Sequence, residues 1–152
     1  MSIQLKVTIN GTAEAIWKVI TDIDNAAETI SGINKIEVLD RPDSGVVGLK
    51  WKEERTMFGK QATETMWIIE AVENVSYTTR AESHGCVFIT SFTIEKTGEG
   101  CSLAMNHQTK PQKLMAKIMS PIMGLFFKGA IKKVILQDLN DIKKKVESTT
   151  ED

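Results

Sequence analysis

The chain has 152 residues, a net charge of −1, 41% hydrophobic residues and 26% charged residues. These values are typical of one soluble globular domain with a single core, and two cysteines exclude a disulfide scaffold. The first ten residues lack a signal-peptide pattern, and no apolar run approaches the roughly 20 residues that a membrane span needs. The expected location is therefore the cytoplasm.

The charge is unevenly distributed along the chain. Residues 1–109 carry a net −5, residues 110–146 a net +7 and residues 147–152 a net −3. The basic segment has no arginine and few aromatic residues, so nucleic acid is not an expected partner. Two interpretations remain, a solvated helix face and transient contact with an anionic membrane, where lysines are attracted to the surface.

The first elements are predicted from local patterns. Residues 2–10 alternate between polar and apolar, which indicates a half-buried strand. Thr12 is a predicted helix N-cap, with Glu14 in the first turn. A helix over residues 12–23 and a second short helix through Ile30 follow, and Gly32 ends the second.

Turn signals then recur every 10 to 15 residues. They separate six predicted strands, which cover residues 33–39, 46–55, 61–72, 75–82, 86–96 and 101–109. Such spacing predicts an antiparallel meander.

From Pro111 onward the apolar spacing becomes helical. The pattern predicts one long helix over residues 111–147, with Pro121 and Gly124 bending or briefly interrupting it. A curved antiparallel sheet must bury one face, and only this helix is long enough to cover it. We therefore expect an α+β domain over residues 1–152, in which a seven-stranded sheet wraps the helix and leaves a cavity.

Several segments resemble the START/Bet v 1-like (SRPBCC) superfamily, in particular its polyketide cyclase/dehydrase and lipid-transport branch. The resemblance covers residues 2–147. It is carried by VTINGTAEAIWKVI at 7–20, Gly48, EAVENVSYTTR at 70–80, FTIEKTGEGCSL at 92–103 and LNDIKKKV at 139–146. It implies a helix-grip fold. It implies no shared catalytic motif, because the family includes lipid carriers, hormone receptors and cyclases.

Four polar residues are candidates for the site. Glu53 and Arg55 share a strand phase, and a buried carboxyl there could serve as a general acid or base. Glu64 shares a phase with apolar neighbours. His107 follows Leu103 at period two and could position a ligand or shuttle a proton. We expect Glu53, Arg55 and His107 to be the catalytic candidates if the chain is an enzyme.

The predicted cavity walls are mostly apolar, as in most small-molecule sites. Besides Glu64 and His107, the predicted ligand-binding residues are Trp51, Tyr77, Phe88, Phe92, Met105, Met115 and Met119. Metal-ligand, phosphate-loop and nucleophile motifs are absent from the sequence, so we expect no metal and no cofactor.

Three functions are therefore considered. The first is the binding or transport of a small hydrophobic molecule, such as a lipid, an isoprenoid or an aromatic, polyketide-like compound. The second is a cyclase/dehydratase-type enzyme acting on such a molecule, and the third is a protein-interaction module. A continuous cavity favours the first two, and a filled core favours the third.

Overall fold

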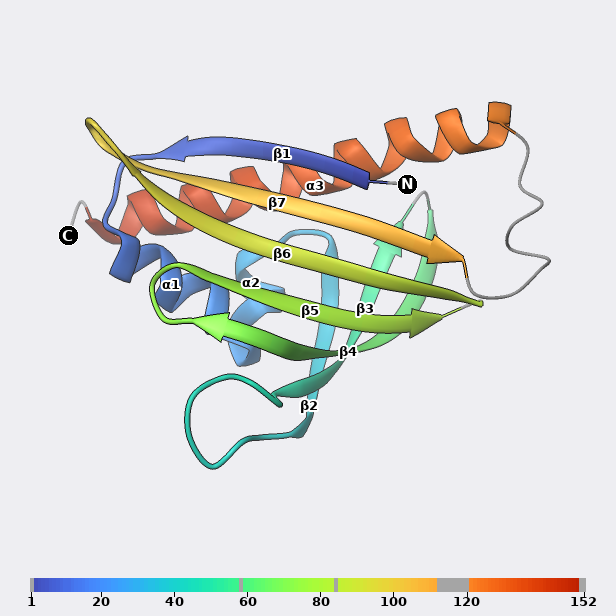
Figure 1. The fold of residues 1–152 in the computed structure, drawn as a ribbon, viewed down its shortest axis with the longest axis horizontal. Helices are drawn as coiled ribbons and strands as arrows, with labels where there is room; N and C mark the ends of the chain where they lie inside the picture. Colours follow the sequence, from blue (N-terminus) through green and yellow to red (C-terminus); the bar gives the residue numbers. More distant parts are fainter. Residues whose placement is uncertain (1, 58, 84, 112–120, 151–152) are drawn as a thin grey trace.

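The computed structural model describes residues 2–57, 59–83, 85–111 and 121–150 (Figure 1). In chain order, its elements are β1 (Ser2–Ile9), α1 (Ala13–Thr21), the 3-10 helix η1 (Ile23–Asn25), α2 (Ala26–Thr29), β2 (Ile33–Asp40), β3 (Lys50–Met57), β4 (Lys60–Val72), β5 (Ser76–Ser83), β6 (Cys86–Thr97), β7 (Gly100–Pro111) and α3 (Pro121–Thr150).

The strands form one seven-stranded antiparallel sheet in the order β1-β7-β6-β5-β4-β3-β2. Strands β2 to β7 form a meander, and β1 completes the opposite edge by pairing with β7. Helix α3 packs against β1, α1 and β7, and Figure 1 shows it extending along the sheet beside β1. The predicted helix-grip arrangement, with short helices after the first strand, is confirmed.

Helix α1 begins where the sequence predicts. Thr12 Oγ1 accepts a hydrogen bond from the backbone N–H of Ala15 at 3.1 Å, which satisfies one free donor of the first turn. Gly11 precedes it, and a Cβ atom there would lie 2.8 Å from Val146 Cγ1. The small residue therefore lets the start of α1 come close to the end of α3.

The core lies between the sheet, α1 and the C-terminal half of α3. Its most deeply buried side chains come from β1, α1, β4, β7 and α3, and they are Ile3, Ile9, Ile16, Ile68, Leu103, Leu139, Ile142 and Val146. On α3 these residues follow the helical period that the sequence showed, so burial of one apolar face fixes the helix on the sheet.

The predicted strand over residues 46–55 begins four residues too early, whereas the other strands agree with the structure to within two residues. Gly45 and Gly48 have positive φ angles of 69° and 96°, and the N–H of Leu49 bonds to the carbonyl of Val46 at 3.1 Å. Residues 45–48 therefore form a turn. Gly48, to which the resemblance gave a strand position, lies in this turn.

The prediction that a helix begins at Pro111 is wrong. Pro111 is the last residue of β7 and pairs with Cys86, and a proline costs least at the end of a strand, where few ladder bonds are lost. Within the described residues, α3 begins at Pro121 and continues through Gly124 without interruption. The part of the prediction on residues 112–120 lies outside the described residues.

Gly100 allows the β6–β7 hairpin to contact the end of β1. A Cβ atom at this position would lie 2.5 Å from the backbone oxygen of Ile9. We expect Gly100→Ala to lower the free energy of unfolding by about 1–3 kcal/mol, because the backbone must shift to remove the overlap. Urea denaturation measures the loss. Gly98→Ala in the same turn is the control, since nothing lies within 4 Å of its Cβ position; equal losses in both variants would contradict the steric explanation.

Candidate ligand-binding site

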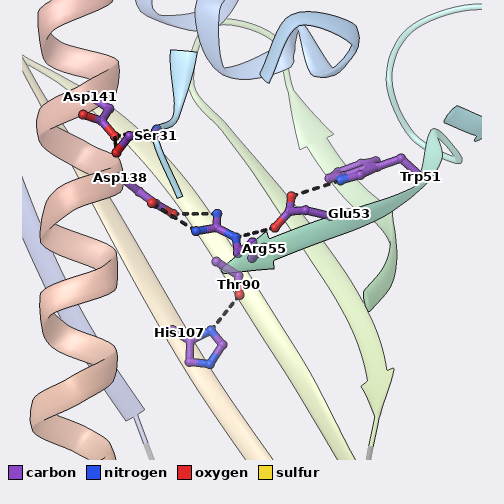
Figure 2. A network of polar contacts seen from close by, with 8 residues as sticks. All are labelled: Ser31, Trp51, Glu53, Arg55, Thr90, His107, Asp138 and Asp141. Carbon is purple, nitrogen blue, oxygen red and sulfur yellow. Dashed lines mark hydrogen bonds and ion pairs between the residues drawn. The ribbon is translucent and has the colours of Figure 1, made fainter. Parts of the chain in front are cut away.

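Strand β3 places alternate side chains on the concave face of the sheet. Trp51 and Glu53 are buried, and Arg55 follows in the same phase (Figure 2). The indole Nε1 of Trp51 donates to Glu53 Oε1 at 3.4 Å, and Arg55 Nε donates to Glu53 Oε2 at 2.6 Å. The charges of Glu53 and Arg55 therefore neutralise each other inside the protein.

Arg55 also joins the sheet to the C-terminal helix. Its Nη1 and Nη2 atoms donate to Asp138 Oδ1 and Oδ2 on α3 at 3.1 and 2.7 Å, which is a bidentate ion pair (Figure 2). The side chains of Arg55 and Asp138 are 17% and 7% exposed. Sequence reasoning missed Asp138. Its position among Ile135, Leu139 and Ile142 was a usable signal, because an acid on an apolar helix face needs a partner.

A second polar contact lies one turn further along α3. Asp141 Oδ2 accepts hydrogen bonds from the backbone N–H and the hydroxyl of Ser31, at 2.9 and 2.8 Å (Figure 2). Gln137 Nε2 donates to the other oxygen of Asp141 at 3.0 Å. The loop between α2 and β2 is thereby held against α3.

A pocket of about 240 Å³ opens between these contacts. It is bounded by the loop between α2 and β2, the end of β3 and the middle of α3, and its lining residues are Ser31, Gly32, Arg55, Thr56, Met57, Lys133, Val134, Gln137 and Asp138. Of the residues predicted for the site, the pocket includes Arg55.

The charged side chains of the site shift one another's pKa values. Burial lowers the pKa of Arg55, but the carboxylates of Glu53 and Asp138 outweigh this effect and raise that pKa above its usual range. Glu64 stands opposite Glu53 in the β3–β4 register. Burial and then the charge of Glu53 raise the pKa of Glu64, with Arg55 opposing. Arg55 therefore stays charged, whereas Glu64 is shifted toward the protonated form, which can donate a hydrogen bond.

His107 lies on β7, on the same concave face, and is half-buried. Its Nδ1 is 2.8 Å from Thr90 Oγ1, and its ring stacks on Phe88 with centroids 5.8 Å apart (Figure 2). Burial, and then the charge of the N-terminal amine, lower the pKa of His107. The imidazole is therefore shifted toward its neutral form, which has one donor and one acceptor nitrogen.

The lowered pKa of His107 predicts a pH dependence of stability. Below the ordinary histidine pKa of 6.5 the unfolded chain takes up a proton that the folded chain resists, so stability should fall as the pH drops. The largest slope for one group is about 1.4 kcal/mol per pH unit. Urea unfolding between pH 7.5 and 5 measures it. His107→Gln should reduce the slope, with every other group unchanged; an unaltered slope would contradict burial of a neutral His107.

The aromatic residues pack between the sheet and α1. Tyr77 is buried, its ring centroid lies 5.2 Å from that of Phe92 and 6.0 Å from that of Trp17, and its hydroxyl donates to the carbonyl of Ile20 at 2.9 Å. Burial and the charge of Glu53 raise the pKa of Tyr77. Its hydroxyl therefore anchors α1 and can offer a ligand only an acceptor lone pair.

The remaining predicted residues divide into two sets. Phe88, Phe92 and Met105 lie on the concave face, where Phe88 pairs with Ala81 of β5 and Phe92 pairs with Met105 of β7. Met115 and Met119 lie outside the described residues. The structure thus brings the predicted strand residues to one face, and their contact with a ligand stays a prediction.

The part of the chain that the structure describes lacks two further features. It contains no group of three or more His, Cys, Asp or Glu side chains arranged to hold a metal ion. None of its helices is both long and apolar enough to cross a membrane.

The seven-stranded sheet around α3, with buried polar groups and a pocket between sheet and helix, defines a START-like (SRPBCC) domain, a class with a ligand-binding fold. The family model "Polyketide cyclase / dehydrase and lipid transport" matches residues 1–147, so the chain belongs to that family. The predicted resemblance is confirmed. No curated protein sequence matches the chain.

Solved structures support the fold at low sequence identity. A START superfamily protein from Mycobacterium smegmatis is 14% identical with a TM-score of 0.79, and the match covers 97% of this chain and 98% of that one. The Zhui aromatase/cyclase from Streptomyces sp. R1128 is 14% identical with a TM-score of 0.76, covering 97% and 93%. The di-domain aromatase/cyclase StfQ from the steffimycin pathway is 13% identical with a TM-score of 0.81, covering 99% of this chain and 52% of that one.

Proposed function

We propose that the chain binds a small hydrophobic molecule between the sheet and α3, and that it acts as a carrier or sensor of a lipid, an isoprenoid or an aromatic, polyketide-like compound. The observation that carries the proposal is the composition of the concave face. Trp51, Phe88, Phe92 and Met105 would form the apolar walls, and the polar side chains of Glu53, Glu64, Thr90 and His107 lie among them on the same face. Such walls with a small number of placed polar groups are the usual form of a small-molecule site.

The polar groups suit recognition of such a ligand. Glu53 and Arg55 bind each other, so they stabilise the wall and are not free to bind a ligand charge. Glu64 and His107 are the groups best suited to a ligand hydroxyl or carbonyl, because both are shifted toward neutral forms that exchange hydrogen bonds.

Titration with the neutral dye N-phenyl-1-naphthylamine tests the proposal. We expect saturable fluorescence enhancement at one site per chain, which unlabelled apolar compounds reverse. A pair of variants locates the site: Phe88→Asp, at a half-buried position of the concave face, should abolish binding, and Thr78→Asp on the opposite face should retain it, with circular dichroism checking that both stay folded. No binding by the unaltered protein would count against the proposal and favour the protein-interaction module.

The alternative is a cyclase/dehydratase-type reaction on such a molecule. The observation that favours it is that Glu64 and His107 are partly buried groups on the concave face that could each exchange a proton with a substrate. Two of the structural neighbours, StfQ and Zhui, are aromatase/cyclases, which supports the same alternative. Turnover of an aromatic polyketide precursor that is lost in His107→Gln would establish it.

Transient contact with an anionic membrane is part of the carrier proposal. Lys132 and Lys133 are exposed on α3, and Leu136 beside them is 44% exposed. Lysines contribute roughly 1 kcal/mol each near an anionic surface, and salt screens the attraction. We expect co-sedimentation with phosphatidylserine vesicles at low salt and release at high salt. Equal, negligible binding to neutral and anionic vesicles would remove the membrane role.

A further inference from the structure

We propose that the pocket beside Arg55 is the entrance to the interior site, and that two side-chain contacts close it. The first contact is the ion pair between Arg55 and Asp138, and the second is the pair of hydrogen bonds from Ser31 to Asp141 (Figure 2). We call them the two clasps. The inference rests on the proposed function, since an entrance needs an interior ligand.

A chain of polar contacts runs from the pocket to the predicted binding wall. Arg55 and Asp138 line the pocket, and Arg55 bonds to Glu53, which in turn bonds to the indole of Trp51. The exposed fraction of the side chain falls from 17% for Arg55 to 10% for Glu53, and Trp51 beyond them is buried. The first clasp therefore stands between the solvent-facing pocket and the buried wall.

The clasps are the kind of contact that can open while the fold persists. They join α3 to a part of the sheet with which it shares no strand ladder, namely the end of β3 and the adjoining loop at residues 31–32, next to the point where Ile33 pairs with Arg55. The C-terminal part of α3 is held separately by Leu139, Ile142 and Val146, which are almost fully buried. Because buried residues on both sides of Asp138, among them Ile135 and Leu139, keep the helix in place, the contacts at residues 138 and 141 can break by rotation of side chains alone.

Gly32 adds a steric element to the closure. A Cβ atom at this position would lie 3.3 Å from Arg55 Nη1, and the carbonyl of Gly32 accepts a bond from the N–H of Thr56 at 3.3 Å. The loop backbone thus rests on the guanidinium group of Arg55. If the side chains of both clasps rotate apart, a gap opens between this edge of the sheet and α3 while the loop stays bonded to β3.

An entrance of this kind sets the association and dissociation rates of the ligand and leaves the affinity for the ligand unchanged. If a ligand passes only through the open form, weakening a clasp raises the open population and speeds association and dissociation by the same factor. A residue that binds the ligand would instead change the dissociation constant. Rates measured beside affinity therefore separate the two roles.

Stopped-flow mixing with N-phenyl-1-naphthylamine provides the test. In Asp138→Asn and in Asp141→Asn we expect both rate constants to rise about tenfold, because each change weakens a charge-assisted contact, with the dissociation constant unchanged within about threefold. Asp141→Asn keeps the test decisive should Asp138→Asn fold poorly, since Asp141 is only half-buried.

Lys143→Gln is the matched control. Lys143 also joins α3 to the sheet, through the carbonyl of Thr8 at 2.7 Å, but it does not line the pocket, so its rates should stay at those of the unaltered protein. Unchanged rates in both clasp variants, or an equal rise in Lys143→Gln, would overturn the entrance while leaving the proposed function intact. Absence of dye binding by the unaltered protein would overturn both.

Discussion

Replacing Arg55 with leucine should lower the free energy of unfolding by about 3–5 kcal/mol at pH 7, because the change leaves two buried carboxylates, Glu53 and Asp138, without a counter-charge. A loss of this size is a large part of the total stability of an ordinary domain. Urea denaturation followed by circular dichroism measures it. Acidification should return part of the loss in this variant, because protonation of the stranded carboxylates removes their charge.

The chain offers a matched control on β5. Arg80 bonds to Glu82 two residues away, as Arg55 does to Glu53, but the side chains of Arg80 and Glu82 are 39% and 56% exposed. Arg80→Leu should therefore cost less than about 1 kcal/mol. Similar small losses in both variants would contradict the view that the Arg55 contacts form a buried junction between the sheet and α3.

Enlarging Ala81 to phenylalanine should weaken dye binding by about tenfold or more and change stability by less than about 1 kcal/mol. Ala81 is buried, yet among the described residues it lies outside the main cluster of packed core side chains. It pairs with Met66 and Phe88 on the concave face. A phenylalanine there should fill space that a ligand would otherwise occupy. Parallel dye titration and urea denaturation measure both effects.

Ala13 is the control for this substitution. It is as buried as Ala81, 5% exposed in each case, but it belongs to the packed core cluster. Ala13→Phe should cost about 1–3 kcal/mol or more from overpacking. Equal destabilisation by the two substitutions would indicate a filled interior at Ala81, and with it the protein-interaction function in place of ligand binding.

The fold was largely predictable from local patterns. Alternating residues in β1, the turn signals between strands and the change of period after β7 identified every strand and the long helix. The errors fall where two local signals competed. The turn at Gly45 and Gly48 adjoins apolar residues that suit a strand, and Pro111 suits both a first helical turn and the end of a strand.

The candidate site was predictable only in part. The period-two pattern placed Trp51, Glu53 and Arg55 on one face. In the structure the side chains of Trp51 and Arg55 both donate hydrogen bonds to Glu53. The partners from other elements, Asp138 and Ser31, could not be assigned. Strand phase says nothing about which residue of a distant helix or loop meets a given strand, because that meeting depends on how the helix is placed across the sheet.

Native mass spectrometry of the freshly purified protein tests the central claim, that the chain binds a small hydrophobic molecule in its interior, most directly. We expect a fraction of the protein to carry one extra mass that denaturation releases, and solvent extraction to recover that mass as an apolar compound. Arg80→Leu, altered on the exposed face, should retain this bound mass, and Ala81→Phe should lose it. A bare polypeptide mass that stays bare after incubation with apolar lipid and aromatic compounds would contradict the claim.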